Sequence, residues 1–294
     1  MFGRKHSRIA SANALRILRA VWLLILSGLS ITAQAQPSPT ALAAYDDYIR
    51  TVESRLDRQH QSQQEFLAGL CPDSPADQQL RHHALLLQDL TPHARNIPGA
   101  LLSHWRATAF VPGATVPEFT ALLRGYSAYP RIFAPQVARA SLLRQSGGSD
   151  LVRLRMLQHH VLTVALDATF DVTFGQLDAL HAYSTSASTS ITELTSVSEE
   201  PESLLGPRAD HGFLWRMNSW WSYEQRDGGL YIQFESVSLS RSIPFGLAWA
   251  VSPYVQSIPR DSLTFTLNAA RRALKTSLPA KESSSLATSH AERK

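Results

Sequence analysis

Residues 215–241 read WRMNSWWSYEQRDGGLYIQFESVSLSR. Two segments of alternating polar and apolar residues flank Asp227 and Gly228, a pair that favours the tight turn of a β-hairpin. A two-residue turn would place Trp220 opposite Glu235 and Trp221 opposite Phe234. The stretch therefore predicts two long antiparallel strands, and its three tryptophans divide between the two faces instead of forming one aromatic cluster.

The two faces of this predicted hairpin differ in polarity. One face carries Trp215, Met217, Trp221 and Tyr223 opposite Ser240, Ser238, Phe234 and Ile232, and we expect it to pack as core. The other face holds the candidate ligand-binding residues Arg216, Asn218, Trp220, Tyr231, Glu235 and Arg241. Two interpretations of this second face stay open: a solvated sheet face with one exposed tryptophan, or polar groups that orient the head group of a ligand in an apolar cavity. Trp220 is the residue that we most expect to contact a ligand.

Five more strands are predicted around this hairpin. Residues 101–111 form one strand, and SGGSD at 146–150 joins two others in a hairpin. Residues 161–174 alternate over their whole length, which indicates a strand that is buried on one side. Residues 181–194 carry small side chains at nearly every second position and predict a strand with an exposed serine side.

Helices are predicted between and after these strands. Residues 116–133 predict one or two short helices. A closing helix is expected to start at Ser257 and Pro259 and to carry an apolar stripe of Leu263, Leu267, Ala270 and Leu274. A long antiparallel sheet needs cover on its apolar face, and this closing helix can supply it. The fold class is therefore α+β.

The order of elements resembles that of the START-like (SRPBCC) superfamily, near the polyketide cyclase and coenzyme-Q-binding group, in a branch of secreted bacterial proteins. The segments that carry the resemblance are 110–135, 210–244 and 257–274. It implies a helix-grip fold over 98–277, in which a curved seven-stranded antiparallel sheet wraps a long C-terminal helix. It also implies a cavity between the sheet and that helix for a lipid-like or other hydrophobic molecule.

Residues 36–97 precede this domain and are expected to form a helical extension. Leu42, Tyr45, Ile49, Val52 and Leu56 recur at helical spacing. The opposite helix face mixes acids with arginines, which favours packing on the protein itself, while transient contact with a membrane surface or with another protein stays open.

Cys71, the only cysteine, is expected to be a small buried residue rather than a reactive thiol. With one cysteine, the chain cannot form an internal disulfide.

The first 35 residues have the pattern of a secretory signal peptide. They contain five basic and no acidic residues, a largely apolar run from Ala20 to Ala33, and a small-residue site that predicts cleavage after Ala35. The chain holds 28 basic and 24 acidic residues, so the part after Ala35 keeps 23 basic against 24 acidic residues. A nucleic-acid-binding protein needs a cationic surplus in its folded part, which makes nucleic acid an unexpected partner. Residues 278–294 are polar and are expected to be a disordered tail.

Together these features predict an exported, secreted or periplasmic protein that binds or carries a hydrophobic or lipid-like small molecule. The alternative is a cyclase- or hydrolase-type enzyme that uses Arg216, Asn218 and Glu235 on an apolar substrate. No catalytic fingerprint is present, and we expect neither a metal nor a cofactor. Adjacent histidines such as His82 and His83 would point to opposite faces of a strand, and Asp210–His211 is a weak acid/base candidate.

Overall fold

The computed structural model describes residues 36–91, 97–159, 163–194, 213–242 and 248–277; side chains are not described for 159, 163, 248–256 and 277. Within these ranges one antiparallel sheet has the strand order β1-β2-β8-β7-β6-β5-β4-β3. The strands are β1 (Leu85–Asp89), β2 (Ala100–Pro112), β3 (Val137–Ser146), β4 (Ser149–His159), β5 (Thr163–Asp178), β6 (His181–Glu193), β7 (Arg216–Arg226) and β8 (Gly229–Arg241).

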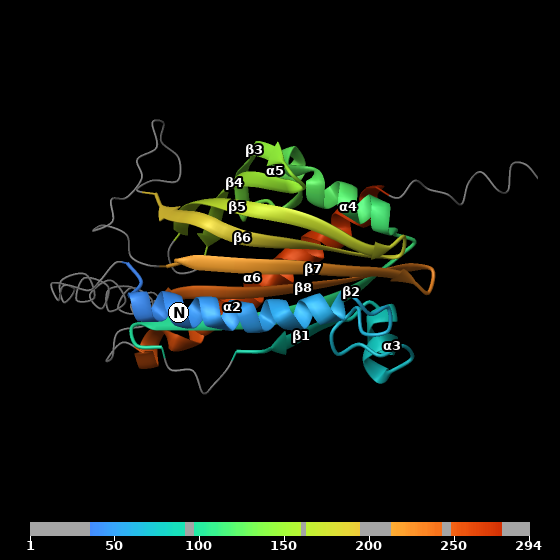
Figure 1. Ribbon diagram of the computed structural model, residues 1–294, viewed down its shortest axis with the longest axis horizontal. Coiled ribbons are helices and arrows are strands. Elements are labelled where there is room, and N and C mark those ends of the chain that lie inside the picture. The colour runs from blue at the N-terminus through green and yellow to red at the C-terminus, as the bar shows by residue number, and fades with distance from the viewer. Residues whose placement is uncertain (1–35, 92–96, 160–162, 195–212, 243–247, 278–294) are drawn as a thin grey trace, which may run out of the picture. The chain divides into compact units, whose positions relative to one another are not determined.

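The described helices are α2 (Pro39–Gln59), α3 (Pro75–Arg81), α4 (Val116–Arg124), α5 (Tyr129–Ile132) and α6 (Ala248–Ser277), with a short 3-10 turn at Tyr126–Ala128. In Figure 1, α2 lies across one face of the sheet and α6 crosses the other face diagonally. We call these the α2 face and the α6 face. The curved sheet and α6 form a helix-grip fold, as the START-like resemblance implied.

The β7–β8 hairpin has the predicted register from Arg216 onward. The placement of Trp215 was wrong: it was predicted on the face of Trp221, but it precedes β7 and packs with Trp220 on the α2 face. Trp220 pairs with Glu235 and Trp221 with Phe234, so the connection is a two-residue turn. Asp227 and Gly228 both adopt positive φ angles, 56° and 72°, which is the conformation that a type I′ turn requires. Because the register is fixed, neighbouring residues along each strand face opposite sides of the sheet.

The α6 face is closed beneath the second half of α6. Leu263, Leu267, Ala270 and Leu274 form the predicted apolar stripe and are buried. They pack with side chains of the central strands, including Ala107, Ala109, Val111, Trp221, Tyr223, Ile232 and Phe234. At about 25 cal/mol per Å² of buried apolar surface, this cluster is a main source of the stability of the fold.

The α2 face is covered by the N-terminal extension. Tyr45, Ile49, Val52 and Leu56 are buried against the sheet as predicted, together with Ala41, whereas Leu42 is only partly buried. Ser38 caps the helix, because its Oγ accepts a hydrogen bond of 3.1 Å from Ala41 N, and Pro39 fits the first turn. This position agrees with a helix that packs on its own protein.

Several expectations need correction. The sheet has eight strands, because residues 85–89 of the extension add β1 to the edge of β2. Helix α6 begins at Ala248, so Ser257 and Pro259 lie inside it; an interior proline removes one backbone hydrogen bond without necessarily ending a helix. Cys71 was expected to be buried but is exposed. The residues of this segment that pack into the core are Phe66, Leu67 and Leu70.

The serine side of β6 was also assigned to the wrong environment. Ser184 pairs with Trp221, which faces α6, so the even-numbered residues up to Ser188 lie on the α6 face instead of an exposed one. Residues 1–35, 278–294 and Asp210–His211 lie outside the described residues. No helix in the described ranges has the length and apolar character that crossing a membrane requires.

The packing under α6 gives a first prediction. Leu267 is 0% exposed, so Leu267→Ala should lower the free energy of unfolding by about 2–5 kcal/mol through lost burial and the cavity left behind. Leu143, at 50% exposed on β3, is the matched control, and Leu143→Ala should change it by less than about 0.5 kcal/mol. Equilibrium unfolding in urea measures both, and equal effects of the two substitutions would contradict this packing.

Candidate functional site

The six predicted ligand-binding residues lie on the α2 face. Trp220 is 2% exposed and packs with Tyr45, Val237 and Leu239 beneath α2. Asn218 Oδ1 accepts a hydrogen bond of 3.1 Å from the hydroxyl of Tyr45. These side chains therefore do not line a cavity between the sheet and α6. The alternation of polar and apolar residues could not show which face of the hairpin lies toward α6, because both faces mix apolar and polar residues.

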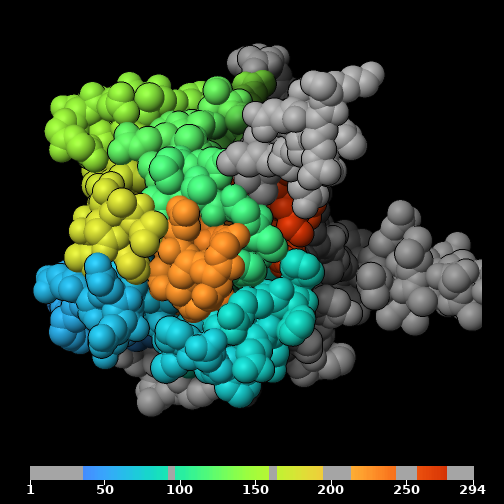
Figure 2. All heavy atoms as spheres, turned by 90° about the vertical axis from the view of Figure 1, so that its right-hand side faces the viewer, coloured from blue at the N-terminus to red at the C-terminus, as the bar shows by residue number. Residues whose placement is uncertain are grey.

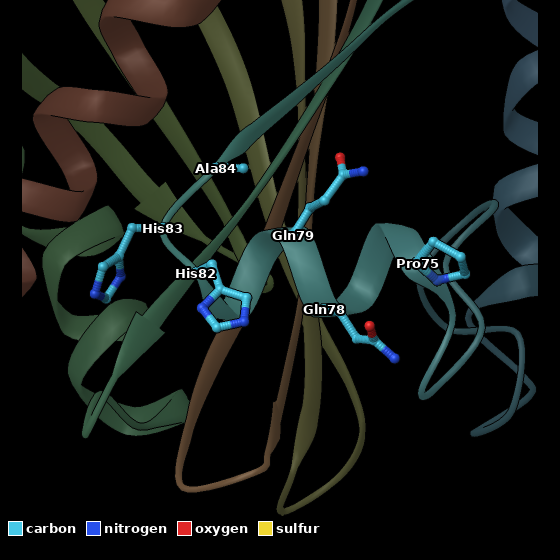
Figure 3. A pocket seen from close by; sticks show the side chains of 6 residues that line it. All are labelled: Pro75, Gln78, Gln79, His82, His83 and Ala84. Atoms are coloured by element: carbon cyan, nitrogen blue, oxygen red, sulfur yellow. The ribbon is translucent and has the colours of Figure 1, made fainter.

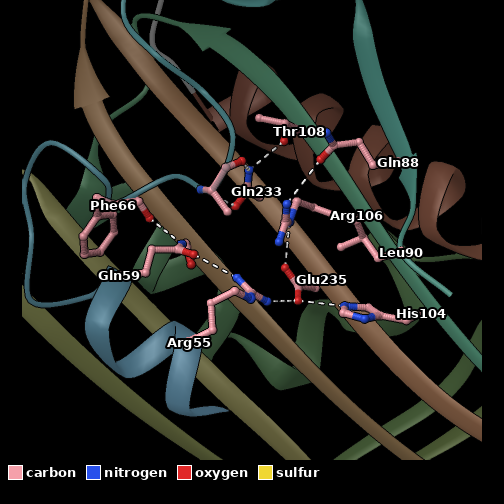
Figure 4. Close-up of polar contacts among 12 residues, drawn as sticks. Arg55, Gln59, Phe66, Gln88, Leu90, His104, Arg106, Thr108, Gln233 and Glu235 are labelled. Carbon is pink, nitrogen blue, oxygen red and sulfur yellow. Dashed lines mark hydrogen bonds and ion pairs between the residues drawn. The ribbon is translucent and has the colours of Figure 1, made fainter. Parts of the chain in front are cut away.

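Glu235 is the centre of a buried ion cluster on the α2 face (Figure 4). One carboxylate oxygen lies 2.7 Å from Nε2 of His104 and also accepts a hydrogen bond from Arg55 of α2. The other oxygen accepts a hydrogen bond of 2.7 Å from Nε of Arg106. His104 continues the chain of contacts, since its Nδ1 lies 2.7 Å from the hydroxyl of Tyr48 in α2.

The electrostatics of this cluster keep Glu235 ionised. Burial alone would raise the pKa of Glu235, but the hydrogen bond from His104 and the charges of Arg106 and Arg55 lower this pKa to about 2. Both oxygens already have partners from the protein, and the carboxylate is almost fully buried. The cluster joins α2 to β2 and β8, which is a structural role.

The remaining predicted residues have structural partners as well. Tyr231 is fully buried, and its hydroxyl donates a hydrogen bond of 3.0 Å to Asp227. The Arg226 guanidinium lies 3.9 Å from the centre of the Tyr231 ring and donates a 2.9 Å hydrogen bond to the buried Asp77 of α3. The Arg216 side chain donates to the carbonyl of Trp215, whereas Arg241 is placed only by the pairing of its backbone with Ala100 at the end of β2.

His60 anchors the segment that follows α2. Its Nε2 lies 2.8 Å from the hydroxyl of Ser222, and its ring stacks on Tyr183 at 4.1 Å between ring centres. Burial and, to a smaller extent, the positive charge of Arg55 lower the pKa of His60 from 6.5 to about 4. His60 is therefore neutral at pH 7.

On the α6 face, large side chains give way to small ones along the strands. Trp221 and Phe234 stack at 4.2 Å, and Phe119 of α4 contacts Trp221 and Tyr223 edge-on. One step further along the strands, the same face carries five serines, which we call the serine floor: Ser103, Ser186, Ser219, Ser236 and Ser238.

The serine floor is an ordered array because the strand register aligns it. Ser236 pairs with Ser219, and Ser219 pairs with Ser186, so that three hydroxyls follow one another across β8, β7 and β6. Ser103 pairs with Ser238 in the next row. Four of the five side chains are half-buried and Ser219 is buried, whereas Val237 and Leu239 on the other side of β8 are completely buried.

Apolar side chains surround the floor. Trp105 pairs with Ser236 at one end of the three-serine row, and Val172 pairs with Ser186 at the other end. Met217 lies beside Ser238. All three are half-buried, so this part of the α6 face combines apolar walls with hydroxyl groups that solvent can reach. The serine floor was not predicted from the sequence. The pattern that could have indicated it is the alternation of Ser236, Ser238 and Ser240 with apolar residues along β8.

Two surface hollows lie elsewhere. One, of about 480 Å³, is lined by α3 and the residues after it: Pro75, Gln78, Gln79, His82, His83 and Ala84 (Figure 3). The His82 and His83 rings are exposed, and no group in the described part of the chain has three or more residues suited to hold a metal ion.

The second hollow has a volume of about 510 Å³ and lies between α4 and the β5–β6 turn. Its lining includes Val116, Thr120, Arg124 and Ala179. Figure 2 shows the end of the described unit where α4, the β5–β6 turn and the β7–β8 turn come together. Both hollows are open to solvent, and neither contains the serine floor.

Comparisons with known proteins concern the fold. No family model matches the chain, and no curated protein matches it in sequence. Among solved structures, the Zhui aromatase/cyclase from Streptomyces sp. R1128 is similar with 14% identity and a TM-score of 0.43, over 62% of this chain and 99% of that one.

Two further structures are similar over much of their length. A STAR-related lipid transfer protein from Xanthomonas axonopodis has 17% identity and a TM-score of 0.39, over 62% of this chain and 97% of the other. Human STARD10 has 12% identity and a TM-score of 0.38, over 70% of this chain and 83% of that one.

The ion cluster gives a second prediction. Glu235→Ala removes the carboxylate between Arg106, His104 and Arg55, and should lower the free energy of unfolding by about 3–5 kcal/mol because two buried groups lose their counter-charge. Asp46→Ala on the exposed side of α2 is the control and should have little effect. Urea unfolding at pH 7 measures both, and a loss below about 1 kcal/mol for Glu235→Ala would refute the role assigned to the cluster.

His60 gives a third prediction. Its pKa is about 4 in the folded state and 6.5 without the fold, so the unfolded chain binds a proton first as the pH falls. Stability should therefore decrease from pH 6.5 to pH 4, by about 3 kcal/mol for this one group. His60→Gln keeps a side-chain amide near Ser222 but cannot titrate. The variant should lose correspondingly less stability over the same pH window in urea unfolding; parallel curves for the two proteins would be the contrary result.

Proposed function

We propose that this protein binds a hydrophobic, lipid-like small molecule between the α6 face of the sheet and the first half of α6. The observation that carries the proposal is the difference in side-chain size between the two ends of the α6 face. Large packed side chains close the face under the second half of α6, whereas beyond Trp221 and Phe234 the face carries small serines, four half-buried and one buried. Small residues at this position leave room that large ones fill elsewhere.

The surroundings of the floor suit a ligand of this kind. Binding sites for small molecules are concave, mostly apolar and equipped with a few placed polar groups. Trp105, Val172 and Met217 supply apolar contacts at the borders, and Phe265 of α6 is half-buried near the closed cluster. The first part of α6, AWAVSPYV at 248–255, has an apolar sequence.

A binding or carrier role agrees better with this arrangement than catalysis does. Arg216, Asn218 and Glu235, the side chains considered for an enzyme, lie on the α2 face with partners of their own. We further propose that the protein is exported, because residues 1–35 have the composition of a signal peptide. Its site of action would then be the periplasm or the exterior of the cell.

The proposal is tested by what the full-length protein retains when purified from its own host. Native mass spectrometry and organic extraction should detect a co-purified lipid-like molecule. Ser186→Leu adds bulk to the floor and should reduce the retained molecule to background, because the added side chain occupies the space of the ligand. Ser190→Leu is the matched control, since Ser190 lies on the same strand but is exposed on the opposite face.

Circular dichroism and urea unfolding must show that both variants fold. Retention of the molecule by Ser186→Leu at the level of the control would refute a site on the serine floor. Absence of any retained molecule from the unmodified protein, and of any binding when lipid extract is added, would refute the proposed function.

A further inference from the structure

Arg271 of α6 is a half-buried cation without a counter-charge in the described part of the chain. Its one hydrogen bond there joins Nη2 to the carbonyl oxygen of His83, at 3.4 Å. Burial lowers the pKa of Arg271, and no nearby carboxylate acts against this effect. The helix dipole favours cations within the last turn of a helix, whereas α6 continues to Ser277. The fold therefore does not account for the charge of this side chain.

His83 occupies a backbone position at which glycine is usual. Its φ angle is 66°, in the left-handed region. The amide of His83 donates to the carbonyl of Leu80, at 2.9 Å, and the amide of Ala84 donates to that of Gln79, at 3.0 Å. These two hydrogen bonds form the Schellman motif that ends α3, and glycine is the common residue at its left-handed position because a side chain is strained there. The imidazole is thus present against the preference of the turn, as side chains at functional sites often are.

The hollow of about 480 Å³ beside α3 lies next to these two residues. His82 and His83 line it with exposed rings, and Figure 3 shows both rings on the same side of α3. Neither imidazole has a hydrogen-bond partner within the described ranges, and none of the described residues that line the hollow is acidic. The nearby Asp77 is buried and is already paired with Arg81 and Arg226. The hollow therefore offers donors and positive charge without a competing carboxylate.

These groups suit an anion that has several acceptor oxygens. Arg271 keeps N–H groups that have no acceptor in the described part of the chain, and each imidazole can donate a hydrogen bond. Lys275 is exposed and lies four residues after Arg271, so that both cations are on one face of α6. Guanidinium groups form strong charge-assisted hydrogen bonds to phosphate, which offers more acceptors than a carboxylate does. A bound phosphate would supply the counter-charge that Arg271 lacks.

We propose that the hollow beside α3 is a phosphate-binding site, in which Arg271 supplies the charge and His82 and His83 donate hydrogen bonds. The phosphate group belongs either to a soluble compound or to the headgroup of a lipid. The site is formed by the N-terminal extension and the last part of α6. It does not include the serine floor, and it does not depend on the proposed function.

Nuclear magnetic resonance of the histidine rings in the full-length protein tests the site with inorganic phosphate at constant pH. His82→Gln and His83→Gly identify the two ring signals. Both signals should shift and saturate with a Kd of about 1 mM. Potassium chloride at the same ionic strength is the control titration, because salt alone screens exposed charges. Ring signals that move no more with phosphate than with chloride would overturn the proposal.

Three substitutions assign the roles. Arg271→Gln should weaken phosphate binding at least about tenfold, because the charge-assisted hydrogen bonds are lost. Arg272→Gln is the matched control: it removes the same charge from the neighbouring, exposed residue and should change the Kd less than about twofold. His83→Gly should weaken binding about threefold, while the midpoint of its unfolding in urea stays equal or rises. A merely structural role of His83 would lower that midpoint instead.

Equal losses of affinity in Arg271→Gln and Arg272→Gln would contradict a defined site and indicate general attraction between charges. Urea unfolding shows whether Arg271→Gln is folded. If it is not, Arg271→Lys replaces it; lysine keeps the charge but lacks the planar fork, so binding should weaken about threefold. An unchanged Kd in Arg271→Lys would then exclude the role assigned to the guanidinium.

Vesicles separate the two sources of phosphate. The full-length protein is sedimented with vesicles of phosphatidylcholine alone and with vesicles that also contain phosphatidic acid. Binding to the second kind that is lost in Arg271→Gln and kept in Arg272→Gln supports the site and assigns it to a lipid headgroup. Binding of inorganic phosphate without binding to either vesicle supports the site and assigns it to a soluble phosphate compound. Binding to neither probe would overturn it.

Discussion

The buried carboxylate of Glu235 is the constraint on which the arrangement of the whole unit depends. It stands in the middle of β8 and is neutralised by Arg106 and His104 from β2 and by Arg55 from α2. An ionised carboxylate at this depth is tolerated only when such partners are present. Removing α2 would leave the sheet with a solvent-exposed apolar face and with an ion cluster that lacks one of its cations. The extension is therefore part of the folded unit rather than an appendage.

This constraint also decides which face of the sheet is left for the proposed ligand. Helix α2 covers Trp220, Val237 and Leu239, so the tryptophan that was most expected to contact a ligand is part of the core. The opposite face is shared between the tight packing of Leu263 and Leu267 and the serine floor. A buried ion cluster specifies position more than it adds stability, since well-packed apolar residues are often as stable. Here the ion cluster fixes α2 on one face of the sheet, so α2 does not cover the α6 face.

Sequence reasoning gave the strands and their register but not the layers. A two-residue turn at Asp227–Gly228 predicts the register that the structure has, whereas a three-residue loop would have moved every pairing. The hairpin sequence does not indicate which helix covers which face of the sheet. That depends on contacts such as the hydrogen bond between Tyr45 and Asn218, which are 173 residues apart in the chain. Strand β1 escaped assignment for a similar reason: five residues at an edge carry too little periodic signal.

The serine floor is best understood as a departure from what stability alone would favour. Serine forms strands less readily than the β-branched residues, and on this face it replaces the kind of side chain that closes the neighbouring cluster. On the buried side of β8, the same strand uses Val237 and Leu239. Proteins commonly break such local rules at functional sites and compensate elsewhere in the fold. The packing of Leu263, Leu267 and Leu274 at one end of the grip, and of α2 on the far face, provides that compensation. A fold stabilised at these two places can keep a row of serine hydroxyls without hydrogen-bond partners among the described residues.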